Sequence, residues 1–240
     1  MRSSKDFSKH FEFFTRMIQE KKPFAFARYA DGERAILENR PILEGTQAFN
    51  VDKWRFFNNH IFSSDLFETC NHREENFFHA ISCSCCDKKT EQFYRGLFAN
   101  HNITFSNLFI NANYQPFINF VKTIEDEVVL IANEKCNSAS YPFKIKKTFE
   151  IKNDCVNWYE SNREQIKTDI RKLAKENDRT LFLIAAGPLS EILIHNMFEE
   201  NGNNMYVDVG SSLDIFTHGI ETRPYQRTDS MYFNKECFFE

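Results

Sequence analysis

The sequence contains no apolar run long enough to cross a membrane and no recognisable secretory signal. Charged residues interrupt its first twenty positions at Lys9, Glu12, Arg16 and Glu20. A spanning helix or a signal peptide needs an unbroken apolar stretch instead. We therefore expect a cytoplasmic protein without an integral membrane segment.

Several catalytic motifs are missing as well. No Gly-x-Gly-x-x-Gly pattern occurs, which argues against a dinucleotide-dependent dehydrogenase. The Gly-x-Ser-x-Gly elbow, the His-Glu-x-x-His zinc motif and the phosphate-binding loop with its lysine are also absent. These absences disfavour hydrolases and nucleoside triphosphatases.

The chain has no excess of positive charge. Lys and Arg total 30 against 34 Asp and Glu, which gives a net charge of -4 and a pI near 6.0. Proteins that bind polyanions usually carry a basic surface. We therefore expect no nucleic-acid partner.

Cysteines are present in an odd number, seven. Three of them form the run Cys83-Ser84-Cys85-Cys86, but no second pair of ligands follows at a spacing typical of zinc sites. The sequence therefore favours reduced, mostly buried thiols over a metal cluster.

Short apolar runs alternate with helical patterns along the 240 residues, and 27 Phe side chains can fill the core between them. We predict helices over 6–21, 52–67, 90–98, 115–124, 155–177 and 189–200. We predict strands directly after Pro23 and over 77–81, 103–110, 128–132, 181–186 and 205–209, with an edge strand at 148–151. This alternation predicts one α/β domain over residues 1–240, with a Rossmann-like, mainly parallel sheet covered by helices on both faces.

Ligands of such sheets collect where the strands end at their carboxyl termini. The first strand ends in Ala30-Asp31-Gly32-Glu33, where two carboxylates bracket a glycine. Oxygen ligands of this kind suit a hard divalent cation that grips a diphosphate, and Gly32 lets a ligand approach the backbone. Because Asp-Gly is also a common turn dipeptide, a plain turn remains the alternative.

Two later strand ends carry further candidates. Gly187 and Pro188 precede a helix whose free N–H groups favour a phosphate, although tight helix packing would equally explain the glycine. The segment from Asp208 to Asp214 offers acids that can orient a sugar or ribose hydroxyl, and its serines can donate to phosphate oxygens. The alternative is that both acids cap a turn and a short helix.

Amides and a C-terminal pair complete the candidates. Asn111, Asn113 and Asn133 can bind a nucleobase edge or sugar hydroxyls, although asparagine is also an ordinary loop residue. Arg223 can pair with phosphate and Tyr225 can stack on a base, unless the segment is a solvated tail.

Three stretches together resemble the GT-D fold glycosyltransferases. They are Phe26-Ala27-Arg28-Tyr29-Ala30-Asp31-Gly32-Glu33, Ala186-Gly187-Pro188-Leu189 and Tyr206-Val207-Asp208-Val209-Gly210-Ser211. The resemblance extends from about residue 24 to 227, with Ala30 in place of the family's usual glycine. In that family the Asp-x-Glu pair serves the metal and the diphosphate of a nucleotide sugar.

The resemblance implies a transfer reaction with defined parts. Mn²⁺ or Mg²⁺ is expected on Asp31 and Glu33, Arg28 is expected to support these carboxylates or the phosphates, and Glu33 or Asp208 is the expected base. The donor would be a UDP-sugar carrying glucose, galactose or xylose, and the acceptor a glycan or glycoprotein; assembly into a homodimer stays open. Expected catalytic residues are Asp31, Glu33 and Asp208; expected donor contacts are Arg28, Tyr29, Gly32, Asn111, Asn113, Asn133, Gly187, Pro188, Gly210, Ser211, Ser212, Asp214, Arg223 and Tyr225.

Two other functions remain open at this point. A nucleotide-sugar-binding module without catalysis would use the same strand-end loops. A metal-dependent phosphoesterase could use Asp31, Glu33 and Asp208 as ligands, but it would be expected to offer more His or Asp ligands than this chain does.

Overall fold

A seven-stranded parallel sheet forms the centre of the computed structural model, which describes residues 4–39, 60–98, 102–136 and 140–240. The strands are β1 (Phe24–Tyr29), β2 (Phe77–Ile81), β3 (Asn102–Phe105), β4 (Val128–Asn133), β5 (Ile145–Ile151), β6 (Leu181–Ala185) and β7 (Met205–Asp208). Their order across the sheet is β3-β2-β1-β7-β6-β4-β5, and each neighbouring pair is parallel. The expected α/β architecture is confirmed.

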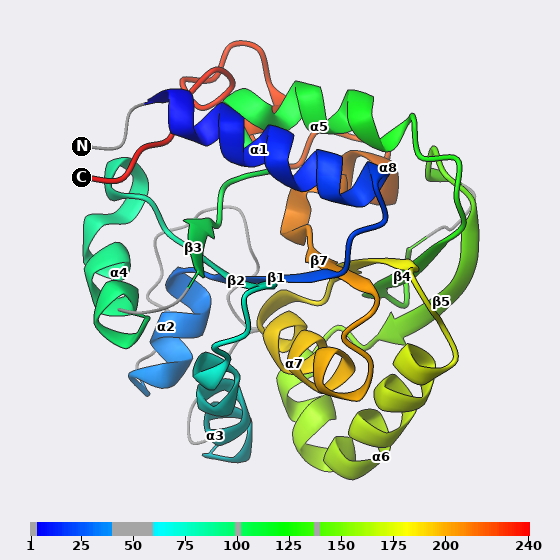
Figure 1. Cartoon of the computed structure of the whole chain (residues 1–240). Helices are drawn as coiled ribbons and strands as arrows, with labels where there is room; N and C mark the ends of the chain where they lie inside the picture. Colours follow the sequence, from blue (N-terminus) through cyan, green and yellow to red (C-terminus); the bar gives the residue numbers. More distant parts are fainter. Residues whose placement is uncertain (1–3, 40–59, 99–101, 137–139) are drawn as a thin grey trace.

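Helices cover both faces of this sheet (Figure 1). They are α1 (Ser4–Gln19), α2 (Asp31–Leu37), α3 (His60–Glu68), α4 (Ser84–Leu97), α5 (Tyr114–Val121), α6 (Cys155–Lys175), α7 (Ser190–Glu200) and α8 (Asp214–His218). In Figure 1, α1, α5 and α8 lie above the sheet, and α2, α3, α6 and α7 lie below it. α4 packs against β2 and α2.

Aromatic side chains fill both interfaces, because alternate residues of the doubly covered strands point into opposite layers. On the α1 side, the Phe14 ring meets the rings of Phe26 and Phe78 edge-on, at centroid distances of 5.0 and 4.9 Å. On the other side, the Tyr29 ring lies 5.6 Å from that of Tyr94 on α4. The high phenylalanine content is therefore used in the core.

Some elements differ in extent from the sequence prediction. The strand expected over 103–110 ends at Phe105, because the chain turns directly afterwards and the Leu108 N–H donates to the carbonyl of Phe105 at 3.2 Å. The edge strand expected at 148–151 is longer and pairs with β4 from Ile145 onward. Of the helix expected over 52–67, positions 52–59 lie outside the described residues, and the rest falls in α3.

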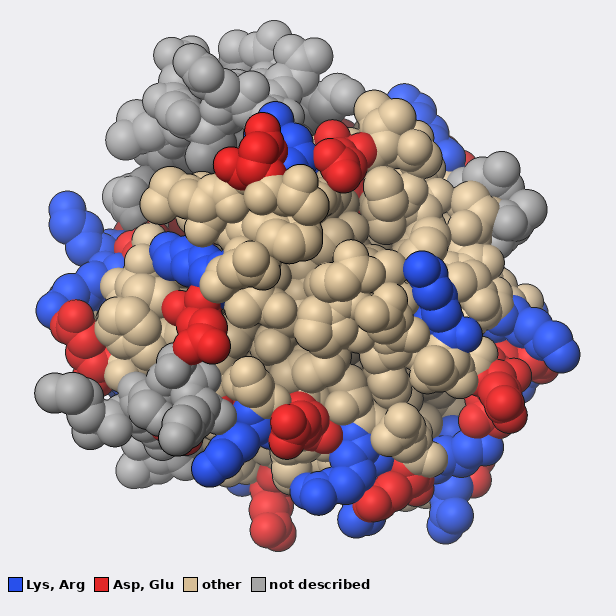
Figure 2. Space-filling model, turned by 90° about the horizontal axis from the view of Figure 1, so that it is seen from above, with Lys and Arg blue, Asp and Glu red and all other residues tan. Residues whose placement is uncertain are grey.

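The outer surface of the molecule on the side of α1 and α5 is largely uncharged at its centre (Figure 2). In the described part of this face, Lys and Arg lie interspersed with Asp and Glu, mostly toward the rim. Within the described residues, none of the helices combines the length and the apolar character that crossing a bilayer requires.

The first and last strands of the described chain pair at the centre of the sheet. β1 pairs with β7, so that Phe24 lies opposite Met205, although β2 and β3 continue the sheet from the other side of β1. Strand order therefore reverses beside β1, and the carboxyl ends of β1, β7 and β6 lie next to one another. Such reversal points are where open parallel sheets bind ligands.

Candidate functional site

Arg28, near the end of β1, connects this strand to the ends of β3 and β7. Arg28 Nε donates a hydrogen bond to the carbonyl of Ser106, just after β3, at 2.8 Å. Its Nη1 lies 3.9 Å from Oδ1 of Asp208, the last residue of β7. The same Oδ1 accepts a hydrogen bond from the Gly210 N–H at 2.8 Å. Both side chains are largely buried, so the pair is little screened by water.

Gly210 makes room for this arginine. Its φ is +50°, a left-handed conformation that side chains disfavour, and a Cβ at this position would lie 1.5 Å from Arg28 Nη1. The guanidinium therefore packs directly over the glycine backbone. Any larger residue would have to move the arginine away from Asp208.

Glu33 turns inward from the first turn of α2. Its Oε2 accepts a hydrogen bond from the Ala30 N–H at 2.8 Å. Loss of hydration raises the pKa of Glu33 to about 7; nearby Asp208 also raises it, whereas the Ala30 hydrogen bond and Arg28 oppose the shift. Ala30 has φ −120°, which any residue adopts, so a glycine is not required there.

Glu191, in the first turn of α7, is a third carboxyl at this place. Its side chain is fully buried, and among the described residues neither carboxyl oxygen has a hydrogen-bond partner at normal distance. Burial, followed by the charges of Glu33 and Asp208, raises the pKa of Glu191 well above its usual value. Burial also raises the pKa of Asp208, opposed by Arg28.

Glu33, Asp208 and Glu191 form what we call the carboxyl cluster. Three acids beside a single guanidinium in a dry setting cannot all be ionised, so the cluster retains protons near neutral pH. The sequence analysis missed Glu191. A usable signal existed, because it is an acid in a helix whose residues 192–194, 197 and 198 are all apolar.

Asp31 behaves differently from Glu33, although both lie in the first turn of α2 rather than in a loop turn. Its side chain is exposed, and a Cβ on neighbouring Gly32 would meet no atom within 4 Å. Mn²⁺ and Mg²⁺ are commonly held by one or two carboxylates together with substrate phosphates. Asp31 with deprotonated Glu33 fits that donor set. Among the described residues, no third ligand joins them within 4.8 Å.

The segment after β7 contacts the C-terminal residues that the sequence analysis named as donor contacts. η6 (Gly210–Leu213) leads into α8, and Ser211 Oγ lies 2.8 Å from the Tyr225 hydroxyl in η7 (Pro224–Gln226). Asp214 Oδ2 accepts hydrogen bonds from Arg223 Nε at 3.2 Å and from Thr222 Oγ1 at 3.1 Å. The C-terminal segment is thus tied to the candidate site rather than solvated.

Three expected donor contacts have other partners. Tyr29 is fully buried in the core, and its hydroxyl lies 2.8 Å from Thr69 Oγ1. Asn133 Nδ2 donates to Asn153 Oδ1 at 2.9 Å. Ser212 is also fully buried. Tyr29 and Ser212 are enclosed in the core, whereas Asn133 is only half-buried.

The structure also places the remaining asparagines and the start of α7. Asn111 and Asn113 are buried in η3 (Asn111–Asn113), and Asn111 Nδ2 donates to Cys237 Sγ at 3.3 Å. Gly187 has φ +58° and opens η5 (Gly187–Leu189), while Pro188 is buried. The Ala186 N–H before this turn already donates to Ser190 Oγ at 3.2 Å. The left-handed backbone conformation alone therefore explains the glycine at position 187.

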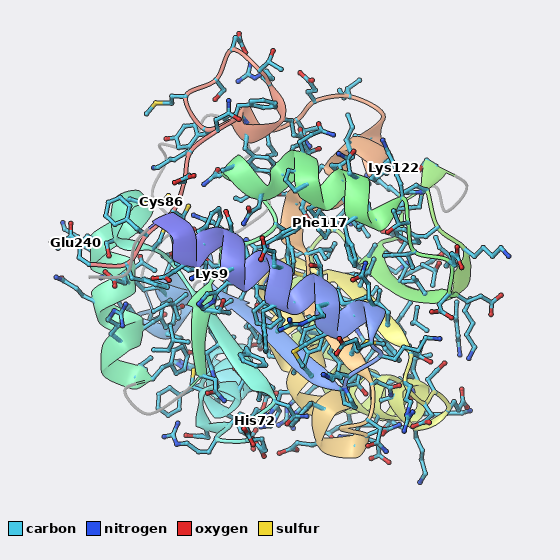
Figure 3. All side chains as sticks on the ribbon, turned by 45° about the horizontal axis from the view of Figure 1, so that its top comes forward. Lys9, His72, Cys86, Phe117, Lys122 and Glu240 are labelled. Atoms are coloured by element: carbon cyan, nitrogen blue, oxygen red, sulfur yellow. The ribbon has the colours of Figure 1, made fainter. Side chains whose placement is uncertain are left out.

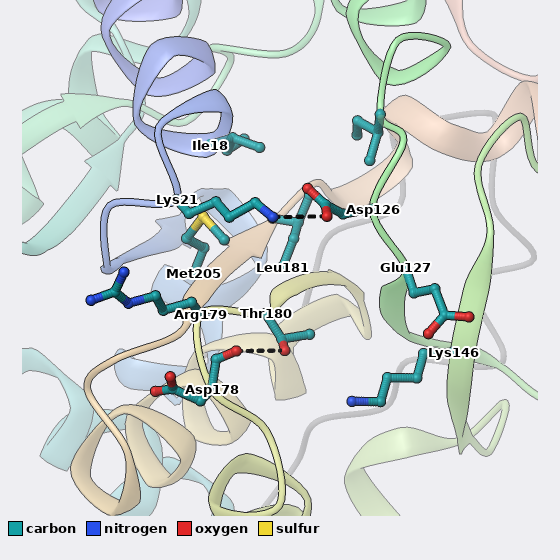
Figure 4. Close-up of a pocket in the computed structure, with 11 residues that line it drawn as sticks. Ile18, Lys21, Asp126, Glu127, Lys146, Asp178, Arg179, Thr180, Leu181 and Met205 are labelled. Atoms are coloured by element: carbon teal, nitrogen blue, oxygen red, sulfur yellow. Dashed lines mark hydrogen bonds and ion pairs between the residues drawn. The ribbon is translucent and has the colours of Figure 1, made fainter.

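A cavity of about 320 Å³ lies at the opposite end of the strands, where β6 and β7 begin (Figure 4). Leu181 and Met205, the first residues of β6 and β7, line it together with the ion pair of Lys21 and Asp126, whose N–O distance is 2.8 Å. Ligands of parallel sheets bind at carboxyl ends instead. We therefore place the candidate site at the carboxyl cluster.

Comparison with known proteins gives a fold. No protein-family model matches the sequence, and no curated protein matches it. A selenomethionine-substituted structure of the domain of unknown function 1792 superposes with TM-score 0.54 at 12% identity, over 99% of this chain and 95% of that chain.

Two further structures of that domain agree. One, described as having a distinct glycosyltransferase fold, has TM-score 0.52 at 12% identity and covers 94% of this chain and 88% of its own. The other, described as a new glycosyltransferase from Streptococcus sanguinis, has TM-score 0.53 at 14% identity and covers 96% and 92%. At such identities the likeness establishes the fold alone.

Proposed function

We propose that this protein is a glycosyltransferase that moves a sugar from a UDP-sugar to a hydroxyl group of a glycan acceptor. The observation that carries the proposal is the meeting of Arg28, Glu33 and Asp208 where β1 and β7 end. Its fold, shared with structures described as glycosyltransferases, supports the same reaction class.

In this proposal Asp31 and Glu33 hold Mn²⁺ or Mg²⁺. When bound, such a cation offsets the charge that develops on the departing diphosphate. Asp31 presents its carboxylate to solvent, where the donor arrives, and Glu33 completes the pair after losing its proton. In the transfer, the acceptor oxygen would bond to the anomeric carbon, the bond from that carbon to the diphosphate oxygen would break so that UDP leaves, and the acceptor hydroxyl would lose its proton to a base.

Arg28 and Asp208 act as positioning residues. Asp208 is only 4% exposed and is held by Arg28 and by the Gly210 N–H. Glu33 is only half-buried, so it is the more accessible of the two expected bases. Arg28 reduces the repulsion within the carboxyl cluster and thereby keeps Glu33 able to ionise.

The direct test measures UDP release from UDP-glucose, UDP-galactose and UDP-xylose with Mn²⁺ or Mg²⁺. We expect release with at least one donor, loss of release in EDTA, and recovery when Mn²⁺ is returned in excess. Asp31→Asn should abolish metal-dependent release without lowering the Tm, because the side chain is exposed.

Asp126→Asn is the matched control, since it removes an exposed carboxylate that lies beside the amino ends of the strands, on the far side of the sheet from the carboxyl cluster. It should retain full activity. Tight UDP binding without turnover would show that the protein is a nucleotide-sugar-binding module and not an enzyme. Activity that survives Asp31→Asn but not Asp126→Asn would show that the site has been placed at the wrong end of the strands.

A further inference from the structure

Four cysteine sulfurs from two distant segments meet at the start of α4. Cys83, Cys85 and Cys86 lie in the turn that opens this helix, and Cys237 lies in the C-terminal segment. The Sγ–Sγ distances are 3.4 Å from Cys83 to Cys85, 4.0 Å from Cys85 to Cys86 and 4.0 Å from Cys86 to Cys237. All four sulfurs lie within 4.8 Å of one another. Figure 3 shows Cys86 where the C-terminal segment passes α4.

These distances decide what the four thiols can hold. All seven cysteines of the chain are free thiols, and a disulfide would need an S–S distance of about 2.0 Å. Zinc binds thiolates at about 2.3 Å in a tetrahedron, which places neighbouring sulfurs about 3.8 Å apart. The observed separations of 3.4 to 4.0 Å bracket that value. A polynuclear iron–sulfur cluster would hold its cysteines farther apart, around several metal ions.

The local backbone forms a compact ligand turn. The N–H groups of Cys86 and Asp87 both donate to the Cys83 carbonyl at 3.0 Å. Asp87 leaves helical geometry, with φ −151° and ψ 88°, so this first turn is set off from the rest of α4. Cys83 and Cys86 have the two-residue spacing of zinc-ligand pairs. The fourth ligand, which the sequence analysis did not find, lies about 150 residues later in the chain.

Polar groups around the sulfurs suit thiolates. Asn111 Nδ2 donates to Cys237 Sγ at 3.3 Å, and Asn107 Nδ2 approaches Cys83 Sγ at 3.6 Å. The Lys235 ammonium donates to the Cys85 carbonyl at 3.0 Å. Four thiolates around Zn²⁺ carry a net negative charge, which such N–H groups and a nearby cation offset.

We propose that Cys83, Cys85, Cys86 and Cys237 bind one structural zinc ion. Because all four ligands come from the protein, the site has no open position for catalysis. The ion fastens the C-terminal segment to the start of α4. Two residues after Cys237, Phe239 stacks on Phe105 of β3, with 4.2 Å between the ring centroids. This proposal stands apart from the glycosyltransferase proposal, because its ligands share no residue with the carboxyl cluster.

The test begins with the unaltered protein, purified under reducing conditions without a metal-affinity column. Elemental analysis by mass spectrometry should find about one zinc per chain. A mercurial that blocks thiols should release it, as measured with a zinc-sensitive dye. After removal of zinc, Co²⁺ should produce the intense charge-transfer and visible bands of a tetrahedral cobalt–thiolate site.

Cys237→Ser should reduce the zinc content and the cobalt–thiolate absorption, whereas Cys136→Ser, which changes a partly exposed thiol outside the group, should retain both. Absence of zinc together with absence of the cobalt bands in the unaltered protein would overturn the proposal. Iron in place of zinc, or a disulfide within the group under reducing conditions, would also overturn it. None of these measurements depends on sugar transfer.

Discussion

Replacement of Gly210 by alanine tests whether the close packing of Arg28 organises the site. Two costs add. A left-handed φ of +50° costs a residue with a side chain about 1–2 kcal/mol. The new Cβ, 1.5 Å from Arg28 Nη1, must also push the guanidinium away. That movement sacrifices a hydrogen bond to a charged group, the 2.8 Å bond to Ser106, at about 1.5–3 kcal/mol.

We therefore expect Gly210→Ala to lower the free energy of unfolding by about 2.5–5 kcal/mol. Gly219→Ala is the control, because Gly219 also has a left-handed φ, +69°, but no atom within 4 Å of its Cβ position. It should cost only about 1–2 kcal/mol. Urea unfolding measures both values, provided that the slope with denaturant is unchanged.

A double-mutant cycle separates the two costs further. In an Arg28→Ala background nothing remains to be displaced, so Gly210→Ala should cost no more than Gly219→Ala does. Equal costs of Gly210→Ala and Gly219→Ala in the unaltered background would refute the steric argument. Arg28 would then be free to move without loss.

Three further predictions concern the carboxyl cluster and the core. Folding raises the pKa of Glu33 to about 7 from a usual 4.5, so the stabilisation that its proton provides is complete below pH 4.5 and is lost as the pH rises through 7. Between pH 5 and 8 the free energy of unfolding of the unaltered protein should therefore fall relative to that of Glu33→Gln. Parallel curves for the two proteins would contradict this. Glu191→Gln should raise the Tm most at alkaline pH, because it removes a buried acid whose pKa is raised, and a lower Tm at pH 8 would show that the carboxylate has a favourable partner. Phe14→Ala should cost about 3–5 kcal/mol in urea unfolding, since its ring is 1% exposed and packs on Phe26, and a cost below 1 kcal/mol would mean that the core repacks.

Most of the fold could be predicted from the sequence, because apolar runs such as Val128–Ala132 and Leu181–Ala186 are short, contiguous and separated by helical patterns. The strand that ends at Phe105 was predicted too long, because the apolar residues that follow it are buried in a turn and look the same in the sequence as a continuing strand. Periodicity describes which residues are buried, but it does not describe where the chain changes direction.

The candidate site was predicted in part. The strand-end rule pointed to Asp208 and the family resemblance pointed to Arg28; their proximity depends on β1 and β7 being neighbours. It could not show that Tyr29 points into the core. Glu191 and Cys237 were missed for a common reason: each acquires its role from partners that are distant in sequence, and one chain without a sheet order does not disclose them.

The pairing of β1 with β7 has a consequence for synthesis on the ribosome. β1 is made before the other described strands, but its partner on one side begins at Met205, so that side has no native hydrogen-bonding partner until β7 has been translated. The same holds for β6, which also waits for β7. Nascent chains stalled before residue 205 therefore leave two hydrophobic strand edges open, and such edges promote aggregation. We expect truncated chains of this protein to depend on chaperones, and release of the final strand to be the step that closes the sheet.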